Sequence, residues 1–406
     1  MWNSRSLRPR SKYHEDVKVA IALAAASWAL PLLGQEALVR SGNDHFYNLE
    51  FDQALADFRQ AEAENPGSPA LHNHVAQTLL FREMFRDGAL ESELVSGNNS
   101  FLRRAKLDPS PETEGDFLAE IGRAMSLGEG ILKANPSDTK ALFALGVSYG
   151  LRANYYWLVK KSWHESLRDA TIARRLHNRI SEVEPGNQDA RLVQGLHDYI
   201  VGSLPLSFRL AGFLIGVHGD KEKGIRTVQD VARKGKFNNI DAQIFLCALY
   251  RRENQPRNAI PLIEDLIQRF PRNFLFRVEL SQMYSMAGDG QRGLSTMEEV
   301  ARLKAQRVPG SDKLSWEKIY FQEGTIQFWY RDFDHALENL QKVAAAREQV
   351  DLNTGVQTYL RMGQIYDLMR RRAEAVACYK KAIGLAPEAG AAQESRRYLS
   401  TPYRRL

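Results

Sequence analysis

The chain has 406 residues, of which 44% are hydrophobic and 26% charged, and its formal net charge is +6. This composition excludes a largely disordered chain and allows either two or three globular domains or one elongated repeat array. The positive charge is too weak and too dispersed to indicate nucleic-acid binding, so no nucleic-acid partner is expected.

The first 34 residues have the order of an export signal. A basic stretch leads into an apolar run of 15 residues, Val19–Leu33, and the small residue Gly34 follows. The run is shorter than the about 20 residues that span a bilayer, which favours a signal peptide cleaved after Gly34 over an anchor. Glu15 and Asp16 interrupt the basic stretch, so an uncleaved anchor and a buried N-terminal helix remain alternatives. The mature protein is expected to be periplasmic or secreted, or else membrane-anchored.

A helix–turn–helix pattern begins directly after this segment. Its first copy has two small residues, one aromatic residue and one proline at fixed offsets, which are Gly42, Ala54, Phe58 and Pro66. The pattern resembles the tetratricopeptide repeat (TPR), a 34-residue unit of two packed helices. The small residues sit where paired helices cross, and the proline ends the second helix. The resemblance implies an all-α, TPR-type helical-hairpin solenoid of about eight helical pairs.

The next copy is elongated. It starts at Leu145, Gly146 and Tyr149 but resumes late, at Ala173 and Pro185, so its first helix is predicted to run on through Trp157. A polar segment at 86–109 before this copy indicates a loop.

The middle of the chain departs from the repeat. Pro205 and Gly216 bracket an apolar segment, 206–217, and Asp220 is a good N-cap for the helix that follows. Together with Gly219 and Gly224, these features of about residues 139–250 are similar to the eukaryotic inclusion-body clearance family of TPR proteins. The resemblance implies an adaptor linked to lipid-droplet or aggregate handling, but an export signal would change the setting, so only the fold is carried over.

The C-terminal part carries further copies, and the last is the clearest. It has Gly363, Tyr366, Ala375, Tyr379 and Pro387 at the repeat's offsets. We therefore predict three parts, which are a signal peptide or anchor at 1–34, a TPR-like region with long helices and insertions at 35–236, and a TPR array with a basic tail at 237–406.

No motif indicates catalysis, a cofactor or a metal. Gly288-x-Gly290-x-x-Gly293 has the letters of a dinucleotide fingerprint but lies in a turn between two repeat helices, without the strand that such a site needs. His72 and His74 are two apart, so on a helix they point in different directions. Cys247 and Cys378 lie far apart in helix patterns, which argues against a paired-cysteine site. The chain is expected not to be an enzyme.

The first helix of each repeat lines the concave face of a TPR solenoid, so a partner is expected there. Aromatic and arginine side chains are common binding hot spots, although packing between repeats is the alternative for each aromatic. The candidate partner-binding residues are Phe46, Tyr47, Tyr155, Tyr156, Arg251, Arg252, Phe328 and Trp329.

Two functions follow as hypotheses. The first is a protein–protein interaction adaptor or scaffold that binds a protein or peptide segment in the concave groove. The alternative is a membrane-associated lipid-binding protein that uses the apolar segment 206–217 for peripheral membrane contact. That segment is 12 residues long, too short to span a bilayer, and core burial is the simpler explanation.

Overall fold

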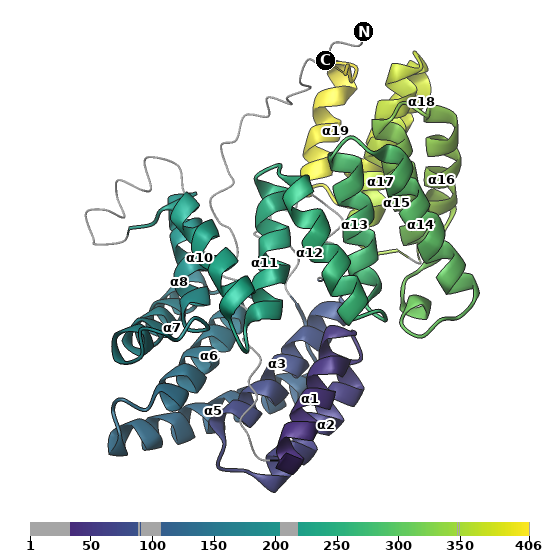
Figure 1. Ribbon diagram of the computed structural model, residues 1–406. Helices are drawn as coiled ribbons and strands as arrows, with labels where there is room; N and C mark the ends of the chain where they lie inside the picture. The colour runs from purple at the N-terminus through teal and green to yellow at the C-terminus, as the bar shows by residue number, and fades with distance from the viewer. Residues whose placement is uncertain are drawn as a thin grey trace. The chain divides into compact units, whose positions relative to one another are not determined.

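The computed structural model describes residues 33–87, 90, 107–203, 218–346, 348 and 350–405. These residues form 17 α-helices and no strand (Figure 1). None of these helices is both long and apolar enough to cross a bilayer. The predicted export signal, apart from its last two residues, and the apolar segment 206–217 lie outside the described residues. The all-α TPR-type solenoid predicted from the sequence is confirmed.

The chain divides into two compact units, one within Val17–Met283 and one that includes Tyr284–Leu406. The boundary predicted at 236/237 falls inside the first of them, between two neighbouring helices. The helices of the first unit are α1 (Leu33–Tyr47), α2 (Phe51–Glu64), α3 (Pro69–Arg86), α5 (Pro111–Ala134), α6 (Thr139–Tyr155), α7 (Trp163–Val183), α8 (Arg191–Gly202), α10 (Lys221–Lys234), α11 (Asn239–Arg252) and α12 (Pro256–Arg269), followed by α13 (Phe274–Met286), which crosses the boundary.

The helix pairs pack through the residues that the repeat pattern singles out. A Cβ atom on Gly42 of α1 would lie 2.6 Å from the ring of Phe58 of α2. Ala54 and Phe58 are fully buried at the same crossing. The glycine is therefore required by the close approach of the two helices.

The elongated copy of the repeat is explained by an α-helix that continues as a π-helical turn. α6 passes directly into a π-helical turn, Tyr156–Lys160, which contains Trp157, as the sequence predicts. Lys161 then takes a positive φ of 53°, and α7 begins two residues later. Asp220 caps α10 as predicted, because its Oδ1 accepts a hydrogen bond of 2.7 Å from the Lys223 backbone N–H.

The second unit is also built from paired helices. Its helices are α14 (Gly290–Ala305), α15 (Trp316–Trp329), α16 (Phe333–Ala345), α17 (Leu352–Leu368), α18 (Arg372–Leu385) and α19 (Gly390–Ser400), with a 3₁₀ turn at Ser311–Lys313. Gly288, in the turn before α14, has a φ of +94°, and a Cβ on Gly290 would meet the ring of Tyr330. Gly288 thus serves the turn between two repeat helices, as the sequence predicts, whereas Gly290 opens α14 in close contact with Tyr330.

Candidate site on the inner face of the last helices

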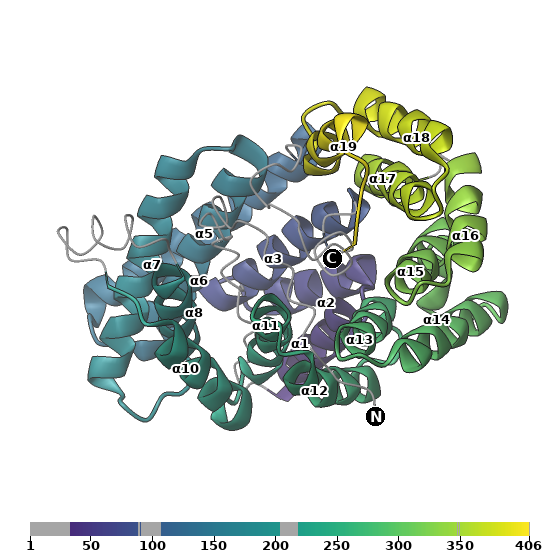
Figure 2. The same ribbon diagram turned by 90° about the horizontal axis from the view of Figure 1, so that it is seen from above.

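The candidate site lies on three first helices of the C-terminal repeats. α17 packs against both α15 and α19, while α16 and α18 form the outer layer (Figure 2). We call the surface of α15, α17 and α19 turned away from α16 and α18 the inner face. After α19, residues Thr401–Arg405, here named the return segment, run back past α17 toward α15 on this face (Figure 2).

Asp367, in the last turn of α17, holds the backbone of the return segment. Its Oδ2 accepts a hydrogen bond of 2.8 Å from the Tyr403 backbone N–H and one of 2.9 Å from the Tyr379 hydroxyl. Arg372 Nη1 donates to Oδ1 over 2.9 Å, and the Asp367 side chain is only 1% exposed. Since a buried carboxylate needs such partners, one position is left for an incoming N–H, and Tyr403 fills it.

Arg405 binds the end of α15. Its Nη2 donates to the carbonyl of Trp329 over 2.7 Å, and its Nη1 donates to the carbonyl of Phe328 over 3.3 Å. These carbonyls belong to the last turn of the helix, where the helix dipole favours a cation. The Phe328 carbonyl also accepts a hydrogen bond of 3.2 Å from the Arg331 backbone N–H. The guanidinium carbon of Arg405 also lies 5.2 Å from the ring centre of Trp329. The site is therefore built for an arginine.

A second arginine, Arg361 of α17, flanks the same two rings. Its guanidinium carbon lies 4.9 Å from the ring centres of both Phe328 and Trp329, within the range of a cation–π contact. Nη1 donates to Gln364 Oε1 over 2.8 Å. Burial, with a smaller contribution from the neighbouring charge of Arg405, lowers the pKa of Arg361 below its ordinary value.

The ring of Tyr403 joins an aromatic cluster. Its centre lies 5.2 Å from that of Tyr398 in an edge-to-face arrangement and 6.3 Å from that of Phe328. Tyr398 in turn lies 5.5 Å from Tyr379. The inner face thus has a position for an aromatic ring beside Tyr398, a carboxylate acceptor for a backbone N–H at Asp367, and a position for an arginine at the end of α15. All three lie within the second unit.

Of the eight candidates from the sequence, Phe328 and Trp329 contact the return segment. Trp329 is 42% exposed, whereas Phe328 is fully buried. The other candidate aromatics are less accessible than a groove requires. Phe46, Tyr47 and Tyr155 are buried and Tyr156 is half-buried.

The two predicted arginines also have intramolecular partners. Arg251 Nη1 lies 2.8 Å from Glu279 Oε2, and both side chains are largely covered. The guanidinium of Arg252 lies 5.7 Å from the ring centre of Tyr199. Packing between helices, the alternative given for each aromatic, describes the buried Phe46, Tyr47, Tyr155 and Phe328. Arg251 is half-buried in its ion pair. Whether any of the eight binds a partner stays a prediction.

The sequence analysis missed Arg361, Asp367, Tyr403 and Arg405. The pair Arg404 and Arg405 is simplest to explain, from sequence, as a solvated helix end. Arg404 is exposed as that explanation expects, although it lies beyond the end of α19, whereas Arg405 is half-buried and binds α15. Only the aromatic–arginine spacing of Tyr403 and Arg405 hinted at a contact, since hot spots favour these types.

A buried polar cluster in the first unit joins α2, α3 and α5. His72 Nδ1 lies 2.8 Å from Glu62 Oε1 and 2.7 Å from Glu120 Oε2, and Nε2 lies 3.0 Å from the carbonyl oxygen of Pro66. Burial disfavours the imidazolium, but these hydrogen bonds and carboxylate charges outweigh it and raise the pKa of His72.

Two arginines lie beside the same cluster. Arg123 Nη1 and Arg59 Nη1 are 3.3 Å and 3.9 Å from Glu120 Oε1. The imidazolium and the two guanidiniums carry three positive charges. Glu62, Glu120 and Asp116, whose Oδ2 lies 3.1 Å from Arg59 Nη2, balance them. The imidazole, Glu62 and Glu120 are close enough to hold a metal ion, but the charge balance is met by the protein itself, and we interpret the cluster as an ion-pair network.

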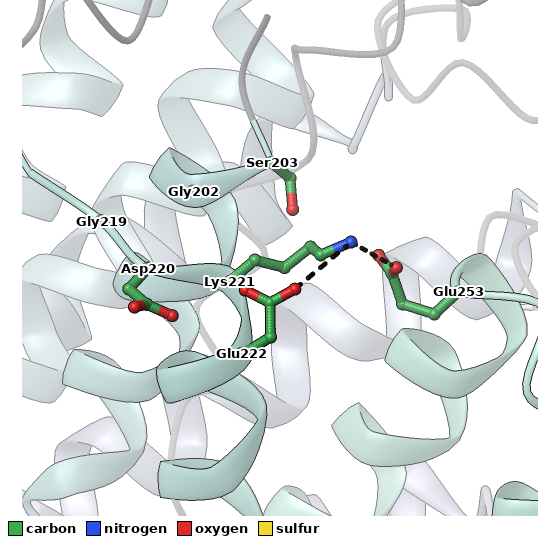
Figure 3. Close-up of a pocket in the computed structure, with 7 residues that line it drawn as sticks. All are labelled: Gly202, Ser203, Gly219, Asp220, Lys221, Glu222 and Glu253. Atoms are coloured by element: carbon green, nitrogen blue, oxygen red, sulfur yellow. Dashed lines mark hydrogen bonds and ion pairs between the residues drawn. The ribbon is translucent and has the colours of Figure 1, made fainter. Parts of the chain in front are cut away.

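A polar cavity of about 480 Å³ lies at the start of α10 (Figure 3). Lys221 Nζ crosses it to reach Glu253 Oε2 at 2.7 Å, and it lies 3.9 Å from Glu222 Oε1. Lys221 and Glu253 are therefore paired with each other, and the Asp220 carboxylate caps α10. We assign the cavity no ligand.

A family model for the tetratricopeptide repeat matches residues 356–388, which hold most of α17 and all of α18. No curated protein matches the chain. Similar solved structures include the Cut9–Hcn1 hetero-tetramer of the APC/C, at 13% identity and a TM-score of 0.49, of which this chain covers 57% while 91% of this chain is covered.

Two further structures are similar over 90% of this chain. They are yeast Tom70, at 14% identity, 95% coverage of that chain and a TM-score of 0.39, and an IFIT1 monomeric mutant with Gppp-AAAA, at 12% identity, 83% coverage and a TM-score of 0.44. The resemblance of the middle region to the inclusion-body clearance family is not confirmed by these comparisons.

Proposed function

We propose that this protein is a non-catalytic interaction adaptor that binds an extended peptide segment on the inner face of α15, α17 and α19. The observation that carries the proposal is the return segment, which already lies there as an extended peptide. It is held through one backbone hydrogen bond and two side chains.

The chemistry of the face supports recognition and not catalysis. Its polar groups are an ion-paired carboxylate, two arginines and the carbonyls at the end of α15. Such groups fix the orientation of a peptide, and aromatic rings supply the desolvated contact area that gives affinity. None of them forms a nucleophile–base pair of the kind that covalent catalysis uses.

A library of linear peptides displayed on phage tests the proposal, with the full chain immobilised. We expect enriched peptides whose affinity falls by about 1–3 kcal/mol in Trp329→Ala, because this exposed ring supplies contact area to the site. Trp163→Ala is the matched control, since Trp163 is also exposed, at 55% against 42%, but lies in the first unit. Its affinity for the same peptides should equal that of the wild type.

The proposal is wrong if no peptide is enriched, or if the enriched peptides bind Trp329→Ala as tightly as they bind the wild type. Thermal melting of both variants shows whether a loss of binding reflects unfolding.

We further propose that the adaptor works outside the cytoplasm, in the periplasm or as a secreted protein. The support is the order of charge and apolar residues in 1–34. Mass spectrometry of the natively produced protein should find an N-terminus at or near Gln35. An intact residue 1 on cytoplasmic protein would contradict export.

A further inference from the structure

We propose that the return segment is an intramolecular ligand of the inner face, and that the external partner is an extended peptide of the same chemistry, an aromatic residue followed two positions later by arginine. This inference rests on the proposed function and names both the partner class and the way in which the site is regulated.

The contacts divide into a general and a specific part. In the hydrogen bond to the Asp367 carboxylate, the return segment supplies only the backbone N–H of Tyr403, so any residue except proline can donate it. The aromatic cluster around Tyr398 and the carbonyls of Phe328 and Trp329 select side chains. An extended chain turns alternate side chains to the same side, which accounts for the spacing of Tyr403 and Arg405.

The residues between and before these two have little contact. Thr401, Pro402 and Arg404 are exposed, whereas Tyr403 and Arg405 are half-buried. Two anchor residues make a weak ligand in themselves, but a tether of a few residues to α19 gives an effective concentration on the order of millimolar. A partner with the same two anchors and further contacts can displace the segment, and the segment reduces the apparent affinity of weaker competitors.

A purely structural role of the return segment predicts a different result when its anchor residues are removed. If Arg405 only caps α15, then removing it weakens the fold and leaves no peptide site behind. The two roles are separated by asking whether loss of the anchors opens a site for a free peptide.

The test uses the full chain and a fluorescein-labelled peptide of residues 400–406, Ser-Thr-Pro-Tyr-Arg-Arg-Leu. The double variant Tyr403→Ala with Arg405→Ala should bind this peptide at least about tenfold more tightly than the wild type, by fluorescence anisotropy. Arg404→Ala is the matched control, because it removes the same charge from the neighbouring exposed position and should behave as the wild type. A peptide with alanine at the tyrosine and second arginine positions should not bind the double variant.

Several results would overturn the inference. One is a double variant that stays folded by circular dichroism but binds no peptide. Another is a wild-type dimer that the double variant turns into a monomer, which would mean that the segment is exchanged between copies. If the double variant does not fold, Arg405→Lys replaces it, since lysine keeps the charge but loses the two-pronged donor, and unchanged peptide binding by that variant would count against the inference.

The phage selection described above separates this inference from the proposed function when it is run on both the wild type and the double variant. Peptides that need Trp329 but lack the aromatic–x–arginine pattern would leave the adaptor function standing and overturn the partner chemistry. An absence of enriched peptides on both chains would overturn the adaptor function itself.

Discussion

At the residue scale, the ion pair between Arg251 and Glu279 joins two helices of the first unit, and both side chains are largely covered. Glu279 is fully enclosed, and burial raises its pKa to about 7 in spite of the neighbouring guanidinium. One oxygen, Oε1, has no hydrogen-bond partner among the described residues. The pair therefore fixes the register of α11 on α13 at a desolvation cost, and its stability contribution depends on both members being present.

Arg251→Ala should destabilise the protein by about 3 kcal/mol at pH 8, because it leaves a buried carboxylate without its counter-ion. Lowering the pH to 5 should relieve most of this loss, since protonated Glu279 needs no counter-ion. Urea denaturation at the two pH values measures both effects. The double variant Arg251→Ala with Glu279→Gln is the control, and a loss in the single variant that does not change with pH would show that the ion pair is not its source.

Two buried histidines should give opposite pH dependences. Burial lowers the pKa of His177 to about 3, so the folded state keeps it neutral while the unfolded state takes up a proton below about 6.5. The stability that depends on neutral His177 is thus present above pH 6.5 and is lost as the pH falls. The pKa of His72 is raised, so its contribution is present below pH 6.5 and is lost as the pH rises through the folded-state pKa.

The same substitution at each position tests these signs. Between pH 6.5 and pH 5, the wild type should lose about 2 kcal/mol of unfolding free energy because of His177. His177→Gln should remove this pH-dependent loss. His72→Gln should instead lose stability mainly at the acidic end, because it removes the cation between Glu62 and Glu120. Identical pH profiles for the two variants and the wild type would contradict the assignment.

At the scale of the element, the crossing of α17 and α18 depends on a missing side chain. A Cβ on Gly363 would lie 2.4 Å from Cε1 of Tyr379, whose hydroxyl is bonded to Asp367. The ring cannot move away without breaking that bond. Gly363→Ala should therefore cost about 1–3 kcal/mol as overpacking.

Gly384, near the end of α18, is the control for that substitution. A Cβ there meets no atom within 4 Å, so Gly384→Ala should be neutral or stabilising by up to about 1 kcal/mol. Urea denaturation of both variants checks the contrast, and equal effects would mean that helix propensity and not packing governs position 363.

The sequence predicted the elements well where they are decided by local signals. Gly42, Ala54, Phe58 and their counterparts around Gly363 mark helix crossings, and Asp220 marks a helix start. The residues of the candidate site were harder to predict from the sequence, because neighbouring helices cover a repeat helix on more than one side. The pattern marks Phe46 and Phe328 as helical aromatics but carries no information about which helix covers them. The fold of the return segment depends on contacts with Asp367 and with the end of α15, which no periodicity encodes.

At the scale of the whole molecule, function and stability have separate places on the chain. The units within Val17–Met283 and from Tyr284 onward each have their own buried core. The ion-pair networks of His72 and Arg251 lie in the first, and the peptide-like contacts of Tyr403 and Arg405 lie in the second. Substitutions in the networks should change unfolding without changing peptide binding, because no residue is shared.

The return segment also changes how the second unit should unfold. In a solenoid each helix pair contacts only its neighbours, so the terminal pair opens first and the others follow one by one. Here Arg405 binds α15 while Tyr403 binds α17, and both are joined to α19 through four intervening residues or fewer. Fraying of α19 therefore also breaks contacts with α15. The backbone amides from α15 to α19 should exchange hydrogen through one shared opening, and a bound partner that displaces the segment would restore stepwise fraying at this end.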